Sequence, residues 1–460
     1  MTHVAIIGAY GSAGVAVAQS LADDAVDLTL VDDGEPGGGL CILRGCMPSK
    51  EVLSAAAHRF QARHDDRLSG VPEVNLDRVV ETKDEHISNF AKHRREAVHR
   101  LAKRENVEFI HDTATLLGDR VVEVGDRTIE PDYLVIATGS TVNVPDIEGI
   151  DEVEFWTSDD VLDAPSLPDS GIVMGFGVIG LELAPYLSEC GVSVTVIEHD
   201  ARPLDDAPAE YGDWILDLYR DQFDIEILTH THEQSVEQTA EGVRLTVERD
   251  GEEEIIEADD LFVFTGRRPN VDGLGLENTS LTVERGWVRE TMQAVEDERT
   301  YVVGDANDKE PLLHVAKEQG FKAAENILAD RAGEPVEAYE NYRHLVVFSG
   351  LGVYPYARVG HTEKSAREAG FDPITVTREA SSDGVFKTKN HPEGTASLVC
   401  ARDGTVLGYQ GLHYHADVMA KTMQVAVANE IDVRTLPDRA YHPTTPEILD
   451  GLFRAAKDDL

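Results

Sequence analysis

Two cysteines stand close together near the start of the chain, in the segment GGGLCILRGCMPSK at residues 37–50. Cys41 and Cys46 are five positions apart, and in a regular helix that spacing separates two Cα atoms by roughly 8–9 Å. A disulfide needs about 4.4–6.8 Å, so the sulfurs can bond only where the helix start is distorted, which Gly45 would ease. Such a bond closes a very small loop and stabilises the fold little. We therefore interpret the pair as a disulfide that is made to be broken and re-formed.

A glycine-rich turn opens the chain, in HVAIIGAYGSAGVAVAQSLA. A short apolar strand runs through Gly8, Gly11 and Gly14 into an Ala-rich helix, and the next apolar strand ends at Asp32. Glycines let the backbone approach a pyrophosphate, the helix N-terminus attracts its charge, and the terminal carboxylate can bind ribose hydroxyls. The layout predicts a dinucleotide site. Its spacing is Gly-x-x-Gly-x-x-Gly, one residue longer than Gly-x-Gly-x-x-Gly, and Tyr10 is the apparent extra residue.

A second turn of the same kind follows in GIVMGFGVIGLELAPYLSECGVSVTVIEHD. Gly175, Gly177 and Gly180 have the Gly-x-Gly-x-x-Gly spacing, and Glu198 ends the next strand. A carboxylate there favours NAD over NADP, because it accepts from the ribose 2′-hydroxyl and would repel a 2′-phosphate. Two such units predict two dinucleotides, and the cysteines beside one of them make a flavin and a nicotinamide the natural pair.

Further segments complete the expected cofactor contacts. YLVIATGS and LFVFTGRRPN are apolar strands that break into Thr-Gly turns, and TYVVGDAN ends a strand at a Gly-Asp pair whose carboxylate could accept from the sugar-like chain of a flavin. Beyond the first glycine turn, the expected FAD contacts are Gly38, Gly39, Thr138, Gly139, Gly304 and Asp305. Beyond the second, the expected NAD contact is Gly266.

In order along the chain, the first glycine turn, GGGLCILRGCMPSK, ATG, GFGVIGLELA, TGRRPN, GDAN and HPTTPE resemble the class I pyridine nucleotide–disulfide oxidoreductases. These flavoenzymes include dihydrolipoamide dehydrogenase and glutathione reductase. The resemblance implies an α/β protein with two Rossmann-like domains, for FAD and NAD, and a C-terminal α+β interface domain. The expected bounds are 1–145 and 266–335 for the FAD-binding parts, 146–265 for the NAD domain and 336–460 for the interface domain.

The resemblance also assigns roles to single residues. Cys46 is expected to be the thiolate nearest the flavin, where it forms a charge-transfer pair, and Cys41 the sulfur that exchanges with substrate. Lys50 is expected beside the flavin N5, paired with Glu182, although Glu182 could also serve only to steady the second glycine-turn helix.

The same resemblance makes His442 the general base and acid for the thiols, with Glu447 orienting its imidazole. In this family the histidine comes from the other subunit. The expected assembly is therefore a two-fold homodimer whose active site needs both chains.

Several positions depart from the pattern of the family. Leu40, Leu43 and Arg44 replace the threonine, asparagine and valine that usually surround the cysteines. In VLGYQGLHYHADVM, the residues His413, Tyr414 and Val418 stand where dihydrolipoamide dehydrogenases typically have glycine, proline and glutamate. These changes are expected to alter the substrate entrance and to leave the electron path intact.

The favoured activity is oxidation of a dihydrolipoyl dithiol by NAD, with a small molecule or a lipoyl-bearing protein as partner. The first alternative is NAD(P)H-dependent reduction of a small disulfide of the glutathione or bis-γ-glutamylcystine type. Mercuric reductase is less favoured, because such enzymes generally carry a C-terminal cysteine pair and GLFRAAKDDL has none. A flavin-binding scaffold of a lipoyl complex is the alternative that is not an enzyme.

The composition limits the setting. The chain has 86 acidic and 41 basic residues and a net charge of −45. Salt screens such repulsion, over about 10 Å at 0.1 M and about 3 Å at 1 M, so we expect adaptation to a salt-rich cytoplasm. This charge disfavours nucleic acid and anionic membranes as partners, and no apolar run reaches membrane-spanning length. HTH and HYH, at residues 230–232 and 413–415, lack a third ligand nearby, so no metal site is predicted.

Overall fold

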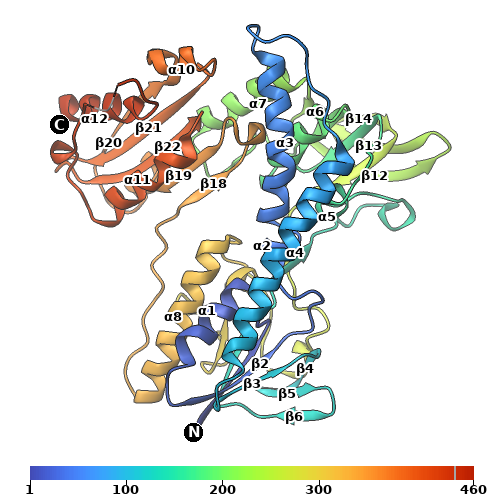
Figure 1. Cartoon of the computed structure of the whole chain (residues 1–460), viewed down its shortest axis with the longest axis vertical. Helices are drawn as coiled ribbons and strands as arrows, with labels where there is room; N and C mark the ends of the chain where they lie inside the picture. Colours follow the sequence, from blue (N-terminus) through green and yellow to red (C-terminus); the bar gives the residue numbers. More distant parts are fainter. Residues whose placement is uncertain (440–441) are drawn as a thin grey trace. The chain divides into compact units, whose positions relative to one another are not determined.

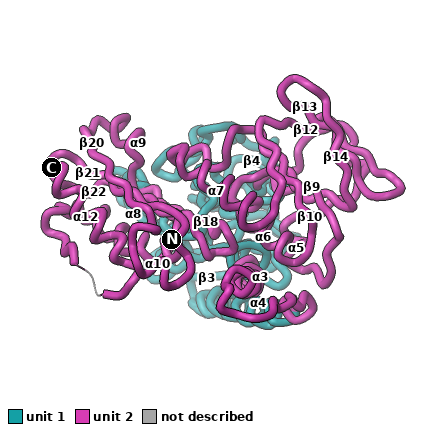
Figure 2. Tube along the Cα trace, turned by 90° about the horizontal axis from the view of Figure 1, so that it is seen from above, with its two compact units in different colours: residues 1–48, 81–143, 267–341 teal, residues 49–80, 144–266, 342–460 magenta. Residues whose placement is uncertain are grey.

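The computed structural model describes residues 1–439 and 442–460. The chain divides into two compact units, drawn in different colours in Figure 2. Unit 1 comprises residues 1–48, 81–143 and 267–341, and unit 2 comprises residues 49–80, 144–266 and 342–460. Compactness does not assign a cofactor to either unit, so the domain bounds expected from the sequence stay a prediction.

Unit 1 contains a five-stranded parallel sheet in the order β17-β7-β1-β2-β3. Its strands are β1 (Thr2–Ile7), β2 (Val26–Val31), β3 (Val107–Ile110), β7 (Tyr133–Ile136) and β17 (Thr300–Val302). These strands are nearly continuous apolar runs, as strands buried on both faces require. Helices α1 (Ser12–Leu21) and α8 (Leu313–Ala332) lie side by side beside the sheet (Figure 1).

Smaller elements surround this sheet. The strands β4 (Ala114–Gly118), β5 (Val121–Val124) and β6 (Arg127–Ile129) form an antiparallel sheet, and β8 (Ser140–Val142) pairs with β16 (Arg267–Pro269). The cysteine segment forms α2 (Leu40–Leu43) and the start of α3 (Cys46–His64), a helix that belongs to unit 2 from Ser49 on. Helix α4 (Leu76–Leu101) follows and belongs to unit 1 from Glu81 on. A 3₁₀ turn, η3 (Gly304–Asn307), follows β17. The glycine turn after β1 and both cysteines, Cys41 and Cys46, therefore belong to unit 1.

Unit 2 contains a four-stranded parallel sheet in the order β11-β10-β9-β15. Its strands are β9 (Ser170–Met174), β10 (Ser193–Ile197), β11 (Glu226–Leu228) and β15 (Asp260–Val263). The associated helices are α5 (Ser158–Leu162), α6 (Val178–Glu189) and α7 (Ala209–Phe223), and β12 (Thr231–Thr239), β13 (Gly242–Arg249) and β14 (Glu252–Ala258) form an antiparallel sheet. The second glycine turn connects β9 to α6.

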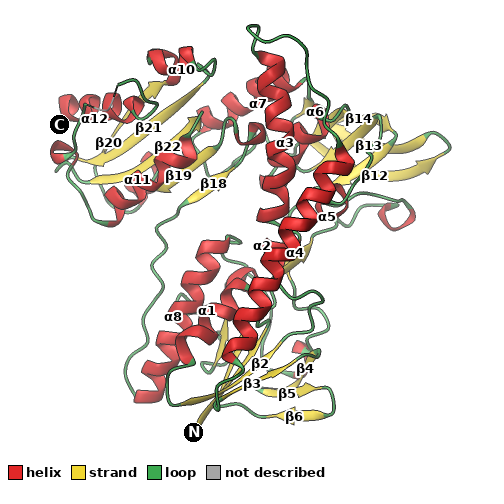
Figure 3. Ribbon diagram, in the orientation of Figure 1, coloured by secondary structure: helices red, strands yellow, loops and turns green. Residues whose placement is uncertain are grey.

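The C-terminal part of unit 2 is an antiparallel sheet in the order β18-β19-β22-β21-β20, coloured yellow in Figure 3. Its strands are β18 (Leu345–Val347), β19 (Tyr356–Gly360), β20 (Pro373–Glu379), β21 (Gly394–Ala401) and β22 (Val406–His413). Its helices are α9 (Glu363–Glu368), α10 (Gly384–Thr388), α11 (Ala416–Ala428) and α12 (Glu447–Asp459). The expected fold class, two Rossmann-like parallel sheets and a C-terminal α+β domain, is confirmed. No helix in the described ranges is both long and apolar enough to cross a bilayer.

Candidate active site

The two cysteines lie on either side of a helix break. Helix α2 ends at Leu43 and α3 begins at Cys46, and Arg44 between them has φ −140° and ψ 12°, outside the helical region. A Cβ atom at Gly45 would lie 3.1 Å from the Cα atom of Cys41, so glycine permits this close approach. The distortion that a bond between Cys41 and Cys46 requires is therefore present.

The two sulfurs interact directly. Both cysteines are reduced in this structure, and a side-chain hydrogen bond joins Cys41 to Cys46. The pKa of the Cys41 thiol is raised well above its ordinary value, and this hydrogen bond is the largest cause and burial the second. When the pair is reduced, the Cys41 thiol therefore holds its proton more tightly than an ordinary cysteine does.

A cavity of about 340 Å³ lies in unit 1, between the first glycine turn and the cysteine segment. Among the expected FAD contacts, those that line it are Gly8, Gly11, Asp32, Gly38, Gly39, Thr138 and Gly139. Leu40, Leu43 and Arg44, the residues that depart from the family pattern, line the same cavity. These departures therefore change the wall of the predicted FAD site itself.

The polar groups of this cavity fit a dinucleotide. Gly11 is the N-cap of α1 and places no side chain over the first amide groups of the helix, so they are open to a phosphate. The hydroxyl of Thr138 is buried and has no hydrogen-bond partner among the described residues. An unpaired hydroxyl in a cavity wall is expected to meet a ligand atom, because an unsatisfied buried polar group is costly.

Two carboxylates are held near the ends of strands in unit 1. Asp32 follows β2 and accepts hydrogen bonds from the amides of Tyr10 and Gly34, at 2.8 and 2.9 Å. Burial raises its pKa despite these bonds. Asp305, in η3, accepts a hydrogen bond from the Ser140 hydroxyl at 2.7 Å. Each carboxylate is therefore oriented by the protein before any ligand binds.

The second glycine turn has the geometry of a nicotinamide-dinucleotide site. Gly177 is the N-cap of α6, again without a side-chain cap, and a Cβ atom at Gly177 would meet open space. Glu198 follows β10, is 9% exposed and accepts from the Asp200 amide at 2.9 Å through Oε1. Gly266 has φ +90° and also faces open space. Oε2 of Glu198 therefore remains available to a ribose hydroxyl.

Lys50 and Glu182 form the expected ion pair within unit 2. The ammonium of Lys50 lies 2.6 Å from Oε2 of Glu182 and 4.3 Å from the ring centroid of Phe348. The other carboxylate oxygen of Glu182 accepts from the Phe348 amide at 3.0 Å. Phe348 was not expected from the sequence as a site residue, because nothing in its segment distinguishes it from a core aromatic.

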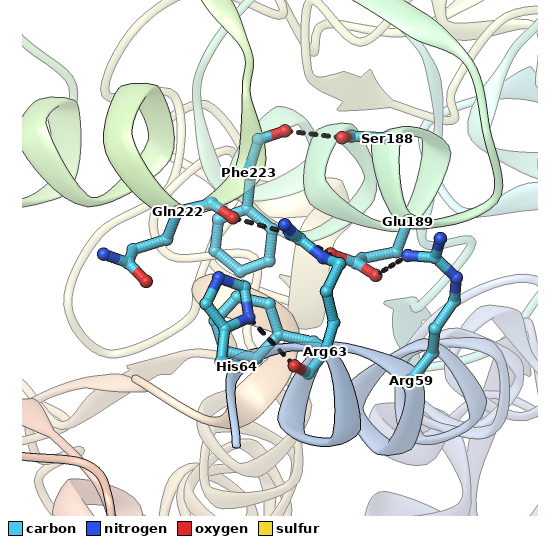
Figure 4. Close-up of polar contacts among 8 residues, drawn as sticks. Arg59, Arg63, His64, Ser188, Glu189, Gln222 and Phe223 are labelled. Carbon is cyan, nitrogen blue, oxygen red and sulfur yellow. Dashed lines mark hydrogen bonds and ion pairs between the residues drawn. The ribbon is translucent and has the colours of Figure 1, made fainter. Parts of the chain in front are cut away.

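A second ion cluster anchors the helix that carries Lys50 (Figure 4). Arg59 and Arg63 of α3 both contact the carboxylate of Glu189 in α6, whose side chain is only 1% exposed. Arg63 also donates to the Gln222 carbonyl at 2.7 Å. Arg59 and Arg63 thus connect α3 to α6 within unit 2 through one buried carboxylate. The cluster lies on the same helix as Lys50, which pairs with Glu182 of α6.

His442 and Glu447 contact each other in the C-terminal part of unit 2. Nδ1 of His442 lies 3.1 Å from Oε1 of Glu447, which also accepts from the Thr444 amide at 2.9 Å. Glu447 begins α12, where a carboxylate is favoured by the helix dipole. The imidazole is 79% exposed within the single chain, so Nε2 is open to a reacting group.

The histidines of the HYH segment have other partners. The buried His413 contacts the Tyr409 hydroxyl at 2.9 Å and the Tyr414 carbonyl at 2.9 Å, and His415 contacts the Thr445 hydroxyl at 3.2 Å. Within the described ranges, no group of three or more histidine, cysteine, aspartate or glutamate side chains could hold a metal ion.

Comparison with known proteins agrees with this geometry. Residues 2–320 match the model of the pyridine nucleotide-disulphide oxidoreductase family, and residues 346–452 match the dimerisation domain of that family. The chain belongs to the pyridine nucleotide-disulphide oxidoreductase family. Its activity is accordingly that of an oxidoreductase acting on sulfur groups, its cofactors are FAD and NAD, and the dimerisation domain supports a homodimer.

Relatives within the family cover nearly the whole chain. It is 29% identical to a dihydrolipoyl dehydrogenase of Haloferax volcanii, over 100% of this chain and 96% of that protein. It is 28% identical to a mercuric reductase of Streptomyces lividans, over 96% and 92% of the two chains. The structure of LpdA from Mycobacterium tuberculosis has the same fold, with a TM-score of 0.83, 23% identity and 99% of each chain covered. Haloferax volcanii is a halophilic archaeon, in agreement with the salt adaptation expected from the charge.

Proposed function

We propose that the protein is a dihydrolipoyl dehydrogenase, which oxidises a substrate dithiol to a cyclic disulfide and reduces NAD. The hydrogen-bonded cysteine pair at the break between α2 and α3 is the observation that carries this proposal. The relative from Haloferax volcanii, which carries that name, supports lipoyl groups as the substrate class. A salt-rich cytoplasm is the proposed setting, and a lipoyl-bearing protein or free dihydrolipoamide the proposed partner.

The chemistry begins at the exposed histidine. His442 removes the proton of a substrate thiol at Nε2, and Glu447 at Nδ1 stabilises the imidazolium that results. The substrate thiolate attacks Sγ of Cys41, the bond between Cys41 and Cys46 breaks, and Cys46 leaves as a thiolate. The second substrate thiolate then displaces Cys41 from the mixed disulfide, which releases the oxidised substrate.

The cofactors complete the electron path. FAD, when bound, relays the electron pair of the thiols to NAD. Gly8, Gly11 and Asp32 would hold its adenosine diphosphate part, and Lys50, steadied by Glu182, would lie near its reactive ring. Gly175, Gly177, Gly180 and Glu198 would hold NAD, with Glu198 selecting against the 2′-phosphate of NADP. Because His442 is exposed in the single chain, we propose that it serves the cysteines of the partner subunit in the dimer.

Mercuric reductase is a second candidate, because a relative of that name covers most of the chain. Reduction of small disulfides by NAD(P)H is the third, since Leu40, Leu43 and Arg44 change the surroundings of the cysteines. Steady-state rates in high salt distinguish the three. The lipoyl substrates are dihydrolipoamide with NAD and lipoamide with NADH. The other substrates are bis-γ-glutamylcystine, glutathione disulfide and Hg²⁺, each with NADH and with NADPH. A larger kcat/KM for Hg²⁺ or a small disulfide than for lipoyl substrates would contradict the proposal.

Variants test whether the cysteine pair carries the reaction. Cys41→Ser and Cys46→Ser should each lower kcat by at least about a thousandfold, since each sulfur forms or breaks a bond in every turnover. Cys190→Ser is the matched control, because Cys190 lies at the end of α6 and burial raises its thiol pKa to about 12. Flavin that is bound without turnover in the wild-type protein would favour the scaffold alternative.

A further inference from the structure

Arg94 lies on the face of α4 that packs inside unit 1. Ala91 and Val98, three residues before it and four after it, are 1% and 0% exposed, so the three side chains share one face. A Cβ atom at Gly38 would lie 3.5 Å from Cβ of Ala91, so this face contacts the segment that leads into the cysteines. The face therefore brings Arg94 beside residues 38–43.

Among the described residues, the Arg94 guanidinium donates hydrogen bonds only to neutral acceptors. Its guanidinium donates to the Tyr10 carbonyl at 3.1 Å and to the Ser12 hydroxyl at 3.4 Å. Within the described part of the chain, no carboxylate forms an ion pair with it. This is unusual in a protein with 86 acidic and 41 basic residues. A half-buried cation without a carboxylate is costly unless an anion forms beside it.

The Cys41 thiol, when ionised, is the group whose charge acts on Arg94. The Tyr10 carbonyl that Arg94 holds would lie 3.3 Å from a Cβ atom at Gly39, two residues before Cys41. Hydrogen bonding to Cys46 and burial raise the pKa of Cys41, the charge of Cys46 raises it further, and the charge of Arg94 acts in the opposite direction. Cys46 and Arg94 are the groups whose charges act on Cys41.

We propose that Arg94 is a positioning residue that stabilises the Cys41 thiolate whenever that sulfur is released from, or attacks, a substrate sulfur. The inference rests on the proposed function, in which Cys41 is the exchanging sulfur. In the oxidation direction, a substrate thiolate attacks the other substrate sulfur in the mixed disulfide. The new substrate S–S bond forms, the Cys41–substrate bond breaks, and the electron pair remains on Cys41 beside the guanidinium. In the opposite direction the same charge favours the attacking Cys41 thiolate.

Alkylation of the reduced protein measures this effect without substrate or turnover. The protein is reduced with a phosphine, treated with iodoacetamide across the pH range 6 to about 10, and digested with trypsin, which cuts after Arg44 and so separates the peptides of Cys41 and Cys46. Arg94→Gln should lower the rate of Cys41 alkylation at pH 7 about tenfold and move its pH profile upward. The preference of Cys41 for anionic iodoacetate over neutral iodoacetamide should also fall.

Matched variants separate charge from structure. Arg94→Lys keeps the positive charge and should retain most of the wild-type rate, whereas Lys92→Gln removes an exposed charge from the same helix and should change nothing. A Cys41 profile in Arg94→Gln that equals the wild-type profile would overturn the proposal. If Arg94→Gln does not fold, Arg94→Lys is the deciding variant. A folded Arg94→Lys protein whose Cys41 is alkylated as slowly as a thiol without a neighbouring charge also overturns the proposal. If the wild-type protein does not turn over lipoyl substrates, the proposed function is refuted, whereas the alkylation result still tests the effect of Arg94 on Cys41.

Discussion

The two glycine turns of the molecule perform the same structural task with loops of different length. Four residues, Gly8 to Gly11, connect β1 to the first residue of α1, and three, Gly175 to Gly177, connect β9 to α6. Both loops begin with a glycine at positive φ, +90° and +94°. In both, the last glycine of the motif packs on the first, since a Cβ atom at Gly14 or Gly180 would lie 2.3 or 2.2 Å from the carbonyl oxygen of Gly8 or Gly175.

The extra residue of the first turn is Tyr10, and it connects the turn to its surroundings. Its side chain is 3% exposed, and its hydroxyl lies 2.7 Å from Nε2 of His99. Its amide donates to Asp32 and its carbonyl accepts from Arg94. The second turn has no counterpart: Phe176 there is a buried ring packed edge-on against Tyr219, at 5.3 Å between centroids. The additional residue therefore leaves the contact between strand and helix intact. It also adds hydrogen bonds from Tyr10 to Asp32 and to two residues of α4, Arg94 and His99.

The largest effect should come from filling the close contact between the last and the first glycine of each turn. Gly14→Val and Gly180→Val place carbon atoms against a carbonyl oxygen, which should cost at least about 3 kcal/mol, or about a hundredfold in cofactor binding. Gly14→Val should be purified without flavin, and Gly180→Val should retain flavin and lose NADH oxidation. Absorbance at the flavin maximum and NADH titration measure the two outcomes.

Gly177→Ala is the control for this pair, because its Cβ atom meets open space within the chain. It should fold with the wild-type melting temperature and weaken only NAD binding. If Gly180→Val lost flavin and Gly14→Val retained it, the assignment of the two turns to FAD and NAD would be reversed.

Tyr10 provides the second test, at a smaller scale. Tyr10→Ala removes a buried ring and should lower the free energy of unfolding by about 3 kcal/mol. Tyr10→Phe removes only the hydrogen bond to His99 and should cost about 1 kcal/mol. Chemical denaturation at constant high salt measures both values. Equal values for the two variants would show that the ring contributes nothing to the first turn.

Asp32 and Glu198, the carboxylates that follow the second strand of each glycine motif, offer a third test. Glu198→Ser removes the carboxylate expected to repel a 2′-phosphate and should raise the kcat/KM ratio of NADPH to NADH about tenfold. Asp32→Ser should leave that ratio unchanged, since Asp32 belongs to the first turn. If the NADPH to NADH ratio changed in Asp32→Ser and not in Glu198→Ser, the first glycine turn would be the NAD site and the second the FAD site.

The smallest expected effect concerns pH. Burial raises the pKa of both Asp32 and Glu198, so the folded state without cofactor binds their protons more tightly than the unfolded state does. Their contribution to stability is present below the unfolded-state pKa near 4 and is lost as pH rises through the folded-state value. Asp32→Asn and Glu198→Gln should therefore gain stability relative to wild type between about pH 4 and pH 7, by less than about 1 kcal/mol. Denaturation of the apoprotein across this pH range is the measurement, and a relative gain toward low pH would contradict the sign.

The sequence by itself determined the order of strands, turns and helices around both glycine motifs. It determined this because the constraints are local: a glycine at positive φ, an apolar run before it and an acid after the next strand act within about thirty residues. The same is true of Cys41 and Cys46, whose spacing already required the helix break that Arg44 and Gly45 provide. The extra residue at Tyr10 was also visible as a spacing.

Only the tertiary structure decided what these local units contact. Arg94 is separated from Cys41 by 53 positions and Phe348 from Lys50 by 298, and neither pairing leaves a periodic or spaced signal in the chain. The direction of the Tyr10 ring, the unpaired hydroxyl of Thr138 and the two arginines around Glu189 also depend on which surfaces meet when the helices pack. Burial and electrostatic coupling are properties of surfaces brought together by folding, which is why residue order alone did not reveal them.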